Sequence, residues 1–154
     1  MQEHLTRSQS ILLVEDNEDD YEATCRAFKK ANLCNPIDWC KSGRDALDYL
    51  KREGAYKDVR KVMRPGLVLL DLNMPGLDGR RTLEAIKQDD ALKRIPVIIL
   101  TTSSDERDIE ACYQSGANTY VQKPVSFDGL IEAIKRLKAY WFEIALLPKE
   151  NGHE

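Results

Sequence analysis

Several side chains that could bind a metal ion or act as a nucleophile stand directly after short apolar segments of this 154-residue chain. If those segments are neighbouring strands of a parallel sheet, their carboxyl ends open onto one crevice, where such sheets bind ligands. The side chains are Glu15 and Asp16 after residues 11–14, Asp71 after 67–70, Thr101 after 96–100, and Lys123 after 119–122. We therefore expect three carboxylates, one hydroxyl and one ammonium to form a single acidic site.

A cluster of three carboxylates requires a counter-charge. Two like charges ~4 Å apart repel by about 4 kcal/mol at an effective dielectric constant near 20. Either one carboxyl is protonated or a divalent cation lies among them. Hard oxygen ligands without histidine or cysteine favour Mg²⁺. We therefore expect Glu15, Asp16 and Asp71 to hold a magnesium ion.

The composition excludes several functional classes. Hydrophobic residues make up 42% and charged residues 32% of the chain, as in ordinary globular proteins, and the length suits one domain. A net charge of −3 argues against a dedicated nucleic-acid binder. The sequence contains neither an apolar run long enough for a membrane span nor a secretory signal at its N-terminus. The four irregularly spaced cysteines favour reduced thiols, so we expect a cytoplasmic protein without direct nucleic-acid or membrane binding.

The elements that must position the acidic site alternate along the chain. Strands are predicted at residues 11–14, 37–40, 67–70, 96–100 and 119–122, and the most apolar of these are typical of strands buried on both faces. Helical spacing of apolar residues follows each strand, with Ser42 as a candidate N-cap, Gly116 as a helix stop and the last helix beginning after Ser126. This alternation predicts an α/β fold, a parallel sheet with helices on both faces and right-handed crossovers.

A basic segment at residues 54–65 interrupts the alternation. From Lys51 to Arg64 the chain carries six basic residues against Glu53 and Asp58. A solvated loop after a helix end and a partner-docking loop are both compatible with this composition.

Four motifs in this order make the chain similar to a known family. They are Glu15-Asp16, the turn at residues 71–76 with Asp78-Gly79, the run 101–103, and residues 120–124. Together they resemble the receiver domain of two-component response regulators over residues 11–137. The resemblance implies a flavodoxin-like, doubly wound sheet of five parallel strands in the order 2-1-3-4-5.

The resemblance implies a phosphoryl-transfer role for the acidic site. Asp71 corresponds to the phosphoacceptor, whose carboxylate attacks phosphorus and becomes an aspartyl phosphate. Glu15 and Asp16 would hold Mg²⁺ together with Asp71, and Asn73 would add its backbone carbonyl. The metal neutralises charge on the transferring phosphoryl oxygens.

The resemblance also implies a conformational switch. Lys123 would supply a fixed positive charge to the phosphoryl group. Thr101 would move towards a phosphoryl oxygen and so make room for Tyr120 to turn, which changes the surface offered to partners. Pro124 is a candidate cis-proline on the same resemblance.

Two other functions fit parts of the pattern. A Mg²⁺-dependent aspartyl-phosphate phosphatase also uses an aspartate at a strand end, but its second aspartate, two residues on, is Asn73 here, which cannot act as a general acid. A flavodoxin-like cofactor binder would need a phosphate-cradling glycine loop after residues 11–14, where acidic residues stand instead. We therefore expect a signalling protein rather than an enzyme.

A narrower resemblance concerns the whole chain. We expect an N-terminal tail at residues 1–9, a receiver domain at 10–138 that includes the basic insertion, and an extension at 139–154. The insertion, the turn after Asp71 and the C-terminal aromatic run resemble stand-alone regulators paired with phytochrome kinases. This implies a sensor histidine kinase as partner, a bacteriophytochrome among the candidates. Because no DNA-binding domain fits after residue 137, we expect output through protein contacts.

The last apolar run predicts an extended C-terminal helix. A helix over residues 126–147 would be about 33 Å long and would overhang the domain. Its apolar side chains, Trp141, Phe142 and Leu146 among them, would then pair with a second copy in a homodimer. A tail that folds back onto its own domain before Pro148 is the alternative.

Overall fold

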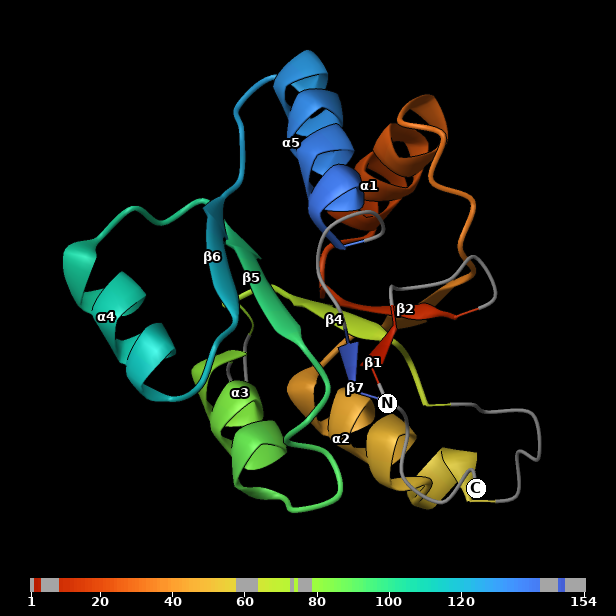
Figure 1. The fold of residues 1–154 in the computed structure, drawn as a ribbon, viewed down its shortest axis with the longest axis vertical. Coiled ribbons are helices and arrows are strands. Elements are labelled where there is room, and N and C mark those ends of the chain that lie inside the picture. Colours follow the sequence, from red (N-terminus) through yellow and green to blue (C-terminus); the bar gives the residue numbers. More distant parts are fainter. Residues whose placement is uncertain are drawn as a thin grey trace.

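The computed structural model describes residues 2–3, 9–57, 64–72, 74, 79–141 and 147–148. Its centre is a five-stranded parallel sheet in the order β3-β2-β4-β5-β6 (Figure 1). The strands are β2 (Ile11–Val14), β3 (Ile37–Cys40), β4 (Leu67–Leu70), β5 (Val97–Thr101) and β6 (Thr119–Gln122). Counted from β2 as the first strand, this is the predicted order 2-1-3-4-5. The fold class predicted from the sequence is therefore confirmed.

Helices cover both faces of the sheet. Helices α1 and α5 pack together on one face, and α2, α3 and α4 lie on the other (Figure 1). Their bounds are α1 (Glu18–Lys30), α2 (Gly43–Lys51), α3 (Gly79–Gln88), α4 (Glu106–Gln114) and α5 (Phe127–Ala139), with a short 3₁₀ helix, η1 (Gly54–Tyr56), after α2. None of the helices in the described ranges is long and apolar enough to cross a bilayer.

Polar side chains begin four of these helices, because the first backbone N–H groups of a helix need acceptors outside it. The caps that accept such a bond are Asn17, Ser42, Asp105 and Ser126. Gly116, with a φ of +104°, follows the end of α4 in the left-handed region that glycine adopts at little cost. The predicted cap at Ser42, the predicted start of the last helix after Ser126 and the predicted stop at Gly116 are therefore confirmed.

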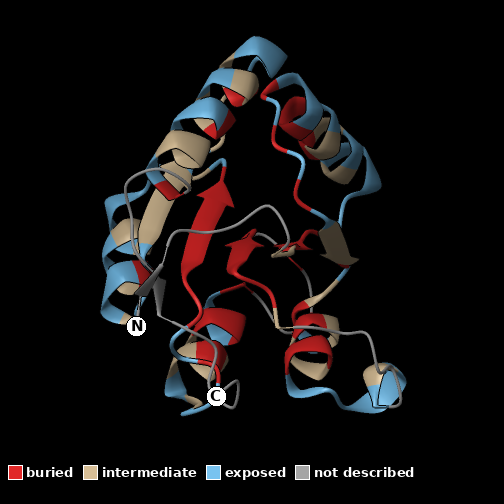
Figure 2. Cartoon of the chain, turned by 45° about the vertical axis from the view of Figure 1, so that its right-hand side comes forward, coloured by how far each residue is buried: buried red, intermediate tan, exposed pale blue. Residues whose placement is uncertain are grey.

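Two apolar cores enclose the sheet because successive side chains of a strand point to opposite faces. The core under α1 and α5 receives Ile11, Leu13, Leu67, Leu69 and Ile98; the core under α2, α3 and α4 receives Leu12, Val14, Val68, Leu70, Val97 and Ile99. The central strands are accordingly buried on both faces (Figure 2). This double burial fixes the strand ends on which the acidic side chains lie.

The C-terminal segment differs from the prediction. Helix α5 ends at Ala139, and Tyr140 and Trp141 follow in one wider, π-type turn. Farther on, β7 (Leu147–Pro148) pairs antiparallel with β1 (Gln2–Glu3), which joins the two ends of the chain. Helix α5 is therefore shorter than the predicted helix over residues 126–147, because Leu147, the last residue of that prediction, lies in a strand. The pairing of β7 with β1 favours the alternative of a tail that folds back.

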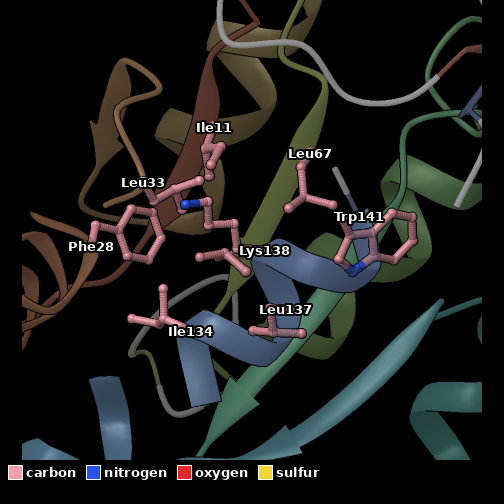
Figure 3. A pocket seen from close by; sticks show the side chains of 9 residues that line it. Ile11, Phe28, Leu33, Leu67, Ile134, Leu137, Lys138 and Trp141 are labelled. Carbon is pink, nitrogen blue, oxygen red and sulfur yellow. The ribbon is translucent and has the colours of Figure 1, made fainter. Parts of the chain in front are cut away.

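Trp141 shows the physical reason for the turn. Its side chain is only 6% exposed and packs into the core between α1, α5 and the sheet, beside an apolar pocket that Leu67 and Leu137 also line (Figure 3). Burying a side chain of this size contributes roughly 1.5–3 kcal/mol, which a helix that overhangs the domain would forgo. Trp141 is thus not available as the predicted dimer contact. Phe142 and Leu146 lie outside the described residues, and the homodimer itself stays a prediction for light scattering to test.

Candidate functional site

The predicted acidic cluster forms at the carboxyl ends of β2 and β4. Glu15 and Asp16 follow β2 directly, and Asp71 follows β4, the strand that pairs with β2. The backbone N–H of Asp71 donates to the carbonyl of Val14, so the last ladder bond draws the two loops together. One carboxylate oxygen from each of the three acidic residues lies within 4.8 Å of the other two. The sheet register therefore creates the site.

Lys123 reaches this cluster from the end of β6. Its Nζ lies 3.0 Å from Oε1 of Glu15, 3.7 Å from Oδ2 of Asp71 and 3.8 Å from Oδ2 of Asp20. The Lys123 side chain is 13% exposed, so its charge acts in a partly desolvated setting. Asp20, which the sequence analysis did not single out, lies in the first turn of α1 and so reaches Lys123.

Burial sets the charge of the site. It raises the pKa of Glu15 from 4.5 to about 7, the nearby Asp71 charge adds to this effect, and Lys123 opposes it. Burial lowers the pKa of Lys123, but its hydrogen bond to Glu15 and the surrounding carboxylates outweigh that effect and raise it. Lys123 therefore does not fully offset the cost of placing a charged Glu15 carboxylate in this buried position beside Asp71.

The donor set fits a magnesium ion. Glu15 and Asp71 are buried while Asp16 is exposed, so the cluster has a protein side and a side open to water. Mg²⁺ is usually held in this way, by a few carboxylates together with several waters. The raised pKa of Glu15 also indicates a site where a cation would relieve repulsion between carboxylates.

Thr101 and Tyr120 lie on the neighbouring strands β5 and β6. Thr101 is fully buried at the end of β5, and its Oγ1 accepts from the backbone N–H of Ser103 at 3.4 Å. The Tyr120 hydroxyl donates to the carbonyl of Ser103 at 2.9 Å, and the half-buried ring packs against the core under α4. The loop after β5 therefore connects the two predicted switch residues through Ser103.

The backbone at Asp71 requires a glycine at position 79, where α3 begins. A Cβ atom at this position would lie 2.3 Å from the backbone oxygen of Asp71 and 2.6 Å from Cα of Leu72. Only glycine permits so close an approach of α3 to the backbone that carries Asp71. The glycine in the Asp78-Gly79 motif therefore has a structural purpose that its spacing alone did not reveal.

One predicted feature of the site lies outside the described residues, and another differs from the structure. Asn73, expected to offer its carbonyl to the metal, lies outside the described residues. The predicted cis bond before Pro124 is wrong, since the described residues contain no cis peptide bond. The trans form is favoured by about 0.5–1 kcal/mol before proline. In that form the Lys123 N–H donates to the Thr101 carbonyl, which continues the pairing of β5 with β6 and keeps the lysine at the site.

Curated relatives share most of the chain. A model of the response regulator receiver domain matches residues 11–135. The probable methanogenesis regulatory protein FilR2 of Methanothrix harundinacea is 39% identical, over 85% of this chain and 82% of FilR2. Response regulator Rcp1 of Synechocystis is 37% identical, over 90% of this chain and 92% of Rcp1.

Solved structures agree with these sequence matches. The phosphorylated cyanobacterial phytochrome response regulator RcpA superposes with a TM-score of 0.84 at 37% identity, covering 92% of this chain and 99% of RcpA. The Mn²⁺-bound form of Rcp1 superposes with a TM-score of 0.82 at 36% identity and the same coverage. Sequence motifs, sheet order and acidic cluster agree with these matches, and the chain belongs to the response regulator receiver family.

Proposed function

We propose that this protein is a phosphorylation-activated response regulator that accepts a phosphoryl group on Asp71 from a sensor histidine kinase. The observation that carries the proposal is the position of the Asp71 carboxylate. It lies 3.7 Å from the ammonium of Lys123 and within 4.8 Å of the Glu15 and Asp16 carboxylates, at the carboxyl edge of a parallel sheet. A nucleophile, a fixed cation and a pair of candidate metal-binding acids thus lie close together.

The reaction uses these groups in distinct roles. An Asp71 carboxylate oxygen forms a bond to phosphorus while the bond from phosphorus to the donor nitrogen breaks, which leaves an aspartyl phosphate and a free histidine. Mg²⁺, held by Glu15, Asp16 and Asp71, would neutralise charge on the phosphoryl oxygens. The Lys123 ammonium would then form an ion pair with a phosphoryl oxygen in place of part of its interaction with the Asp71 carboxylate. Asp71 is only 8% exposed, so little of its surface is open to the donor.

Thr101 and Tyr120 would convert phosphorylation into a change of surface. The Thr101 hydroxyl would turn to a phosphoryl oxygen and give up its contact with the Ser103 N–H. Because the Tyr120 hydroxyl donates to the Ser103 carbonyl, the loop after β5 and the Tyr120 ring would move with it. The surface of α4 and β6 would then signal through protein contacts.

The kinase partner is proposed from similarity. Two of the similar proteins are a cyanobacterial phytochrome response regulator, RcpA, and the response regulator Rcp1. We propose a phytochrome-type histidine kinase as donor and action in the cytoplasm. Phosphotransfer profiling, in which the chain is incubated with phosphorylated histidine kinases, tests the donor: rapid transfer from a phytochrome kinase alone supports it, and preference for a kinase of another sensory class refutes it.

Acetyl phosphate tests the acceptor without a kinase. With Mg²⁺ present, intact-mass measurement should show the addition of one phosphoryl group to the wild-type protein. Asp71→Asn should abolish this addition, and Asp90→Asn, a change at an exposed aspartate, should not. EDTA should suppress labelling because the site carboxylates would then repel the incoming phosphate. Undiminished labelling of Asp71→Asn would refute the proposal.

A further inference from the structure

Trp39, on the edge strand β3, contacts the acidic site through the backbone. Its indole Nε1–H donates to the backbone carbonyl of Glu15 at 2.7 Å. From the sequence, Trp39 is predicted only to lie in the strand at residues 37–40. The uncharged Trp39 side chain on β3 thus fixes the backbone directly after β2, at Glu15, the first of the two acidic residues.

This hydrogen bond fixes how the acidic pair is oriented. The carbonyl of Glu15 and the N–H of Asp16 belong to one planar peptide unit, so holding that carbonyl orients the plane that joins the two residues. The preceding peptide unit is also held, since the Glu15 N–H donates to the Cys40 carbonyl at 3.0 Å. Both peptide units that flank Glu15 are therefore tied to β3.

Aromatic packing holds the indole in place. The Trp39 ring stacks on Tyr21 of α1 with ring centroids 3.9 Å apart and planes 5° from parallel. The Lys41 ammonium lies over the Trp39 ring, 4.8 Å from its centroid. Because Tyr21 lies in the first turns of α1, just after the acidic pair, the stack joins both ends of the loop to the same edge strand.

We infer that Trp39 is a positioning residue, which orients the Glu15 and Asp16 carboxylates for the divalent cation through the peptide unit between them. This inference rests on the proposed function, in which that cation assists phosphoryl transfer. Partners of this kind, which orient the direct ligands of a metal, typically contribute 10–100-fold to its affinity. Loss of the Trp39 N–H should therefore weaken Mg²⁺ binding about 10-fold.

The two tryptophans of the chain supply a matched pair of variants. Trp39→Phe keeps an aromatic ring for the stack on Tyr21 but removes the N–H donor. Trp141→Phe makes the same chemical change at a buried indole whose Nε1 has no hydrogen-bond partner among the described residues. Isothermal titration of each metal-free protein with MgCl₂ gives the affinity, and urea unfolding in EDTA gives the stability. We expect Trp39→Phe to bind Mg²⁺ about 10-fold more weakly and Trp141→Phe to bind as the wild type does.

The outcomes separate this inference from the proposed function. Wild-type Mg²⁺ affinity in Trp39→Phe, or equal weakening in both variants, would overturn the role of Trp39 and leave the metal site intact. A wild-type protein that binds no Mg²⁺ would overturn the site itself, and this inference with it. If Trp39→Phe fails to fold, Trp141→Phe provides the test, since Trp39 is then the single tryptophan. Its indole N–H resonance should shift as Mg²⁺ is added, and an unchanged resonance would refute the role.

Discussion

Removing the charge of Glu15 should make the metal-free protein less sensitive to pH. The folded protein holds the pKa of Glu15 at about 7, against an ordinary value of 4.5, because the carboxyl is buried and faces Asp71. A group with a raised pKa binds more protons in the folded state than in the unfolded chain. Its favourable contribution is fully present below pH 4.5 and is lost as the pH rises through 7. The free energy of unfolding should therefore fall with pH over that window.

The size of this effect follows from the two pKa values. At about 1.36 kcal/mol per pH unit, the contribution lost between pH 5 and pH 8 is about 2–3 kcal/mol. Glu15→Gln cannot ionise, but its amide oxygen can still accept from Lys123. The free energy of unfolding of Glu15→Gln, relative to the wild type, should accordingly rise by about 2–3 kcal/mol from pH 5 to pH 8.

Urea unfolding in EDTA, followed by circular dichroism at several pH values, measures this difference. Asp16→Asn is the matched control, since it removes one charge at the exposed neighbour of Glu15. The control should keep most of the wild-type pH dependence, because the buried carboxyl of Glu15 is still present in it. A difference between Glu15→Gln and the wild type that does not change with pH would refute the electrostatic account of the site.

Three further predictions concern neighbouring features. Gly79→Ala should lower the free energy of unfolding by about 1–3 kcal/mol in urea, because its Cβ would lie 2.3 Å from the Asp71 oxygen; unchanged stability would contradict the close approach. Trp141→Ala should lower the free energy of unfolding by about 3–5 kcal/mol in the same assay. Tyr140→Ala, a change at the exposed neighbouring residue, should lower it by about 0.5 kcal/mol or less. Equal losses would argue against burial of Trp141. Thr101→Ala and Lys123→Ala should still be labelled by acetyl phosphate but should lose the phosphorylation-dependent NMR shift at Tyr120, and wild-type shifts in both would remove the proposed switch.

Local sequence predicted the sheet well because burial on both faces leaves a local signal. The apolar runs at residues 11–14 and 67–70 became strands with those bounds. Because neighbouring parallel strands end at the same edge of a sheet, the strand prediction alone was enough to predict that Glu15, Asp16 and Asp71 lie close together. The hydroxyl of Ser42 likewise allowed the cap of α2 to be predicted from local chemistry alone.

The features that sequence did not predict depend on contacts between distant residues. The pairing of Glu3 with Leu147 joins opposite ends of the chain, and the apolar run that includes Trp141 suited a helix as well as a segment folding back. The bond from Trp39 to the Glu15 carbonyl depends on the register of β3 against β2. In the basic segment, the Tyr56 hydroxyl donates to Asp45 and so holds η1 against α2. The charge composition of the segment gave no indication of this contact.

Chemical mapping of the phosphorylated residue tests the central claim most directly. Sodium borohydride reduces an aspartyl phosphate to homoserine, so the wild-type protein can be phosphorylated in Mg²⁺, reduced, digested and sequenced by mass spectrometry. We expect homoserine at position 71 and at no other aspartate, in the phosphorylated sample alone. Homoserine at another aspartate, with Asp71 unmodified, would contradict this claim.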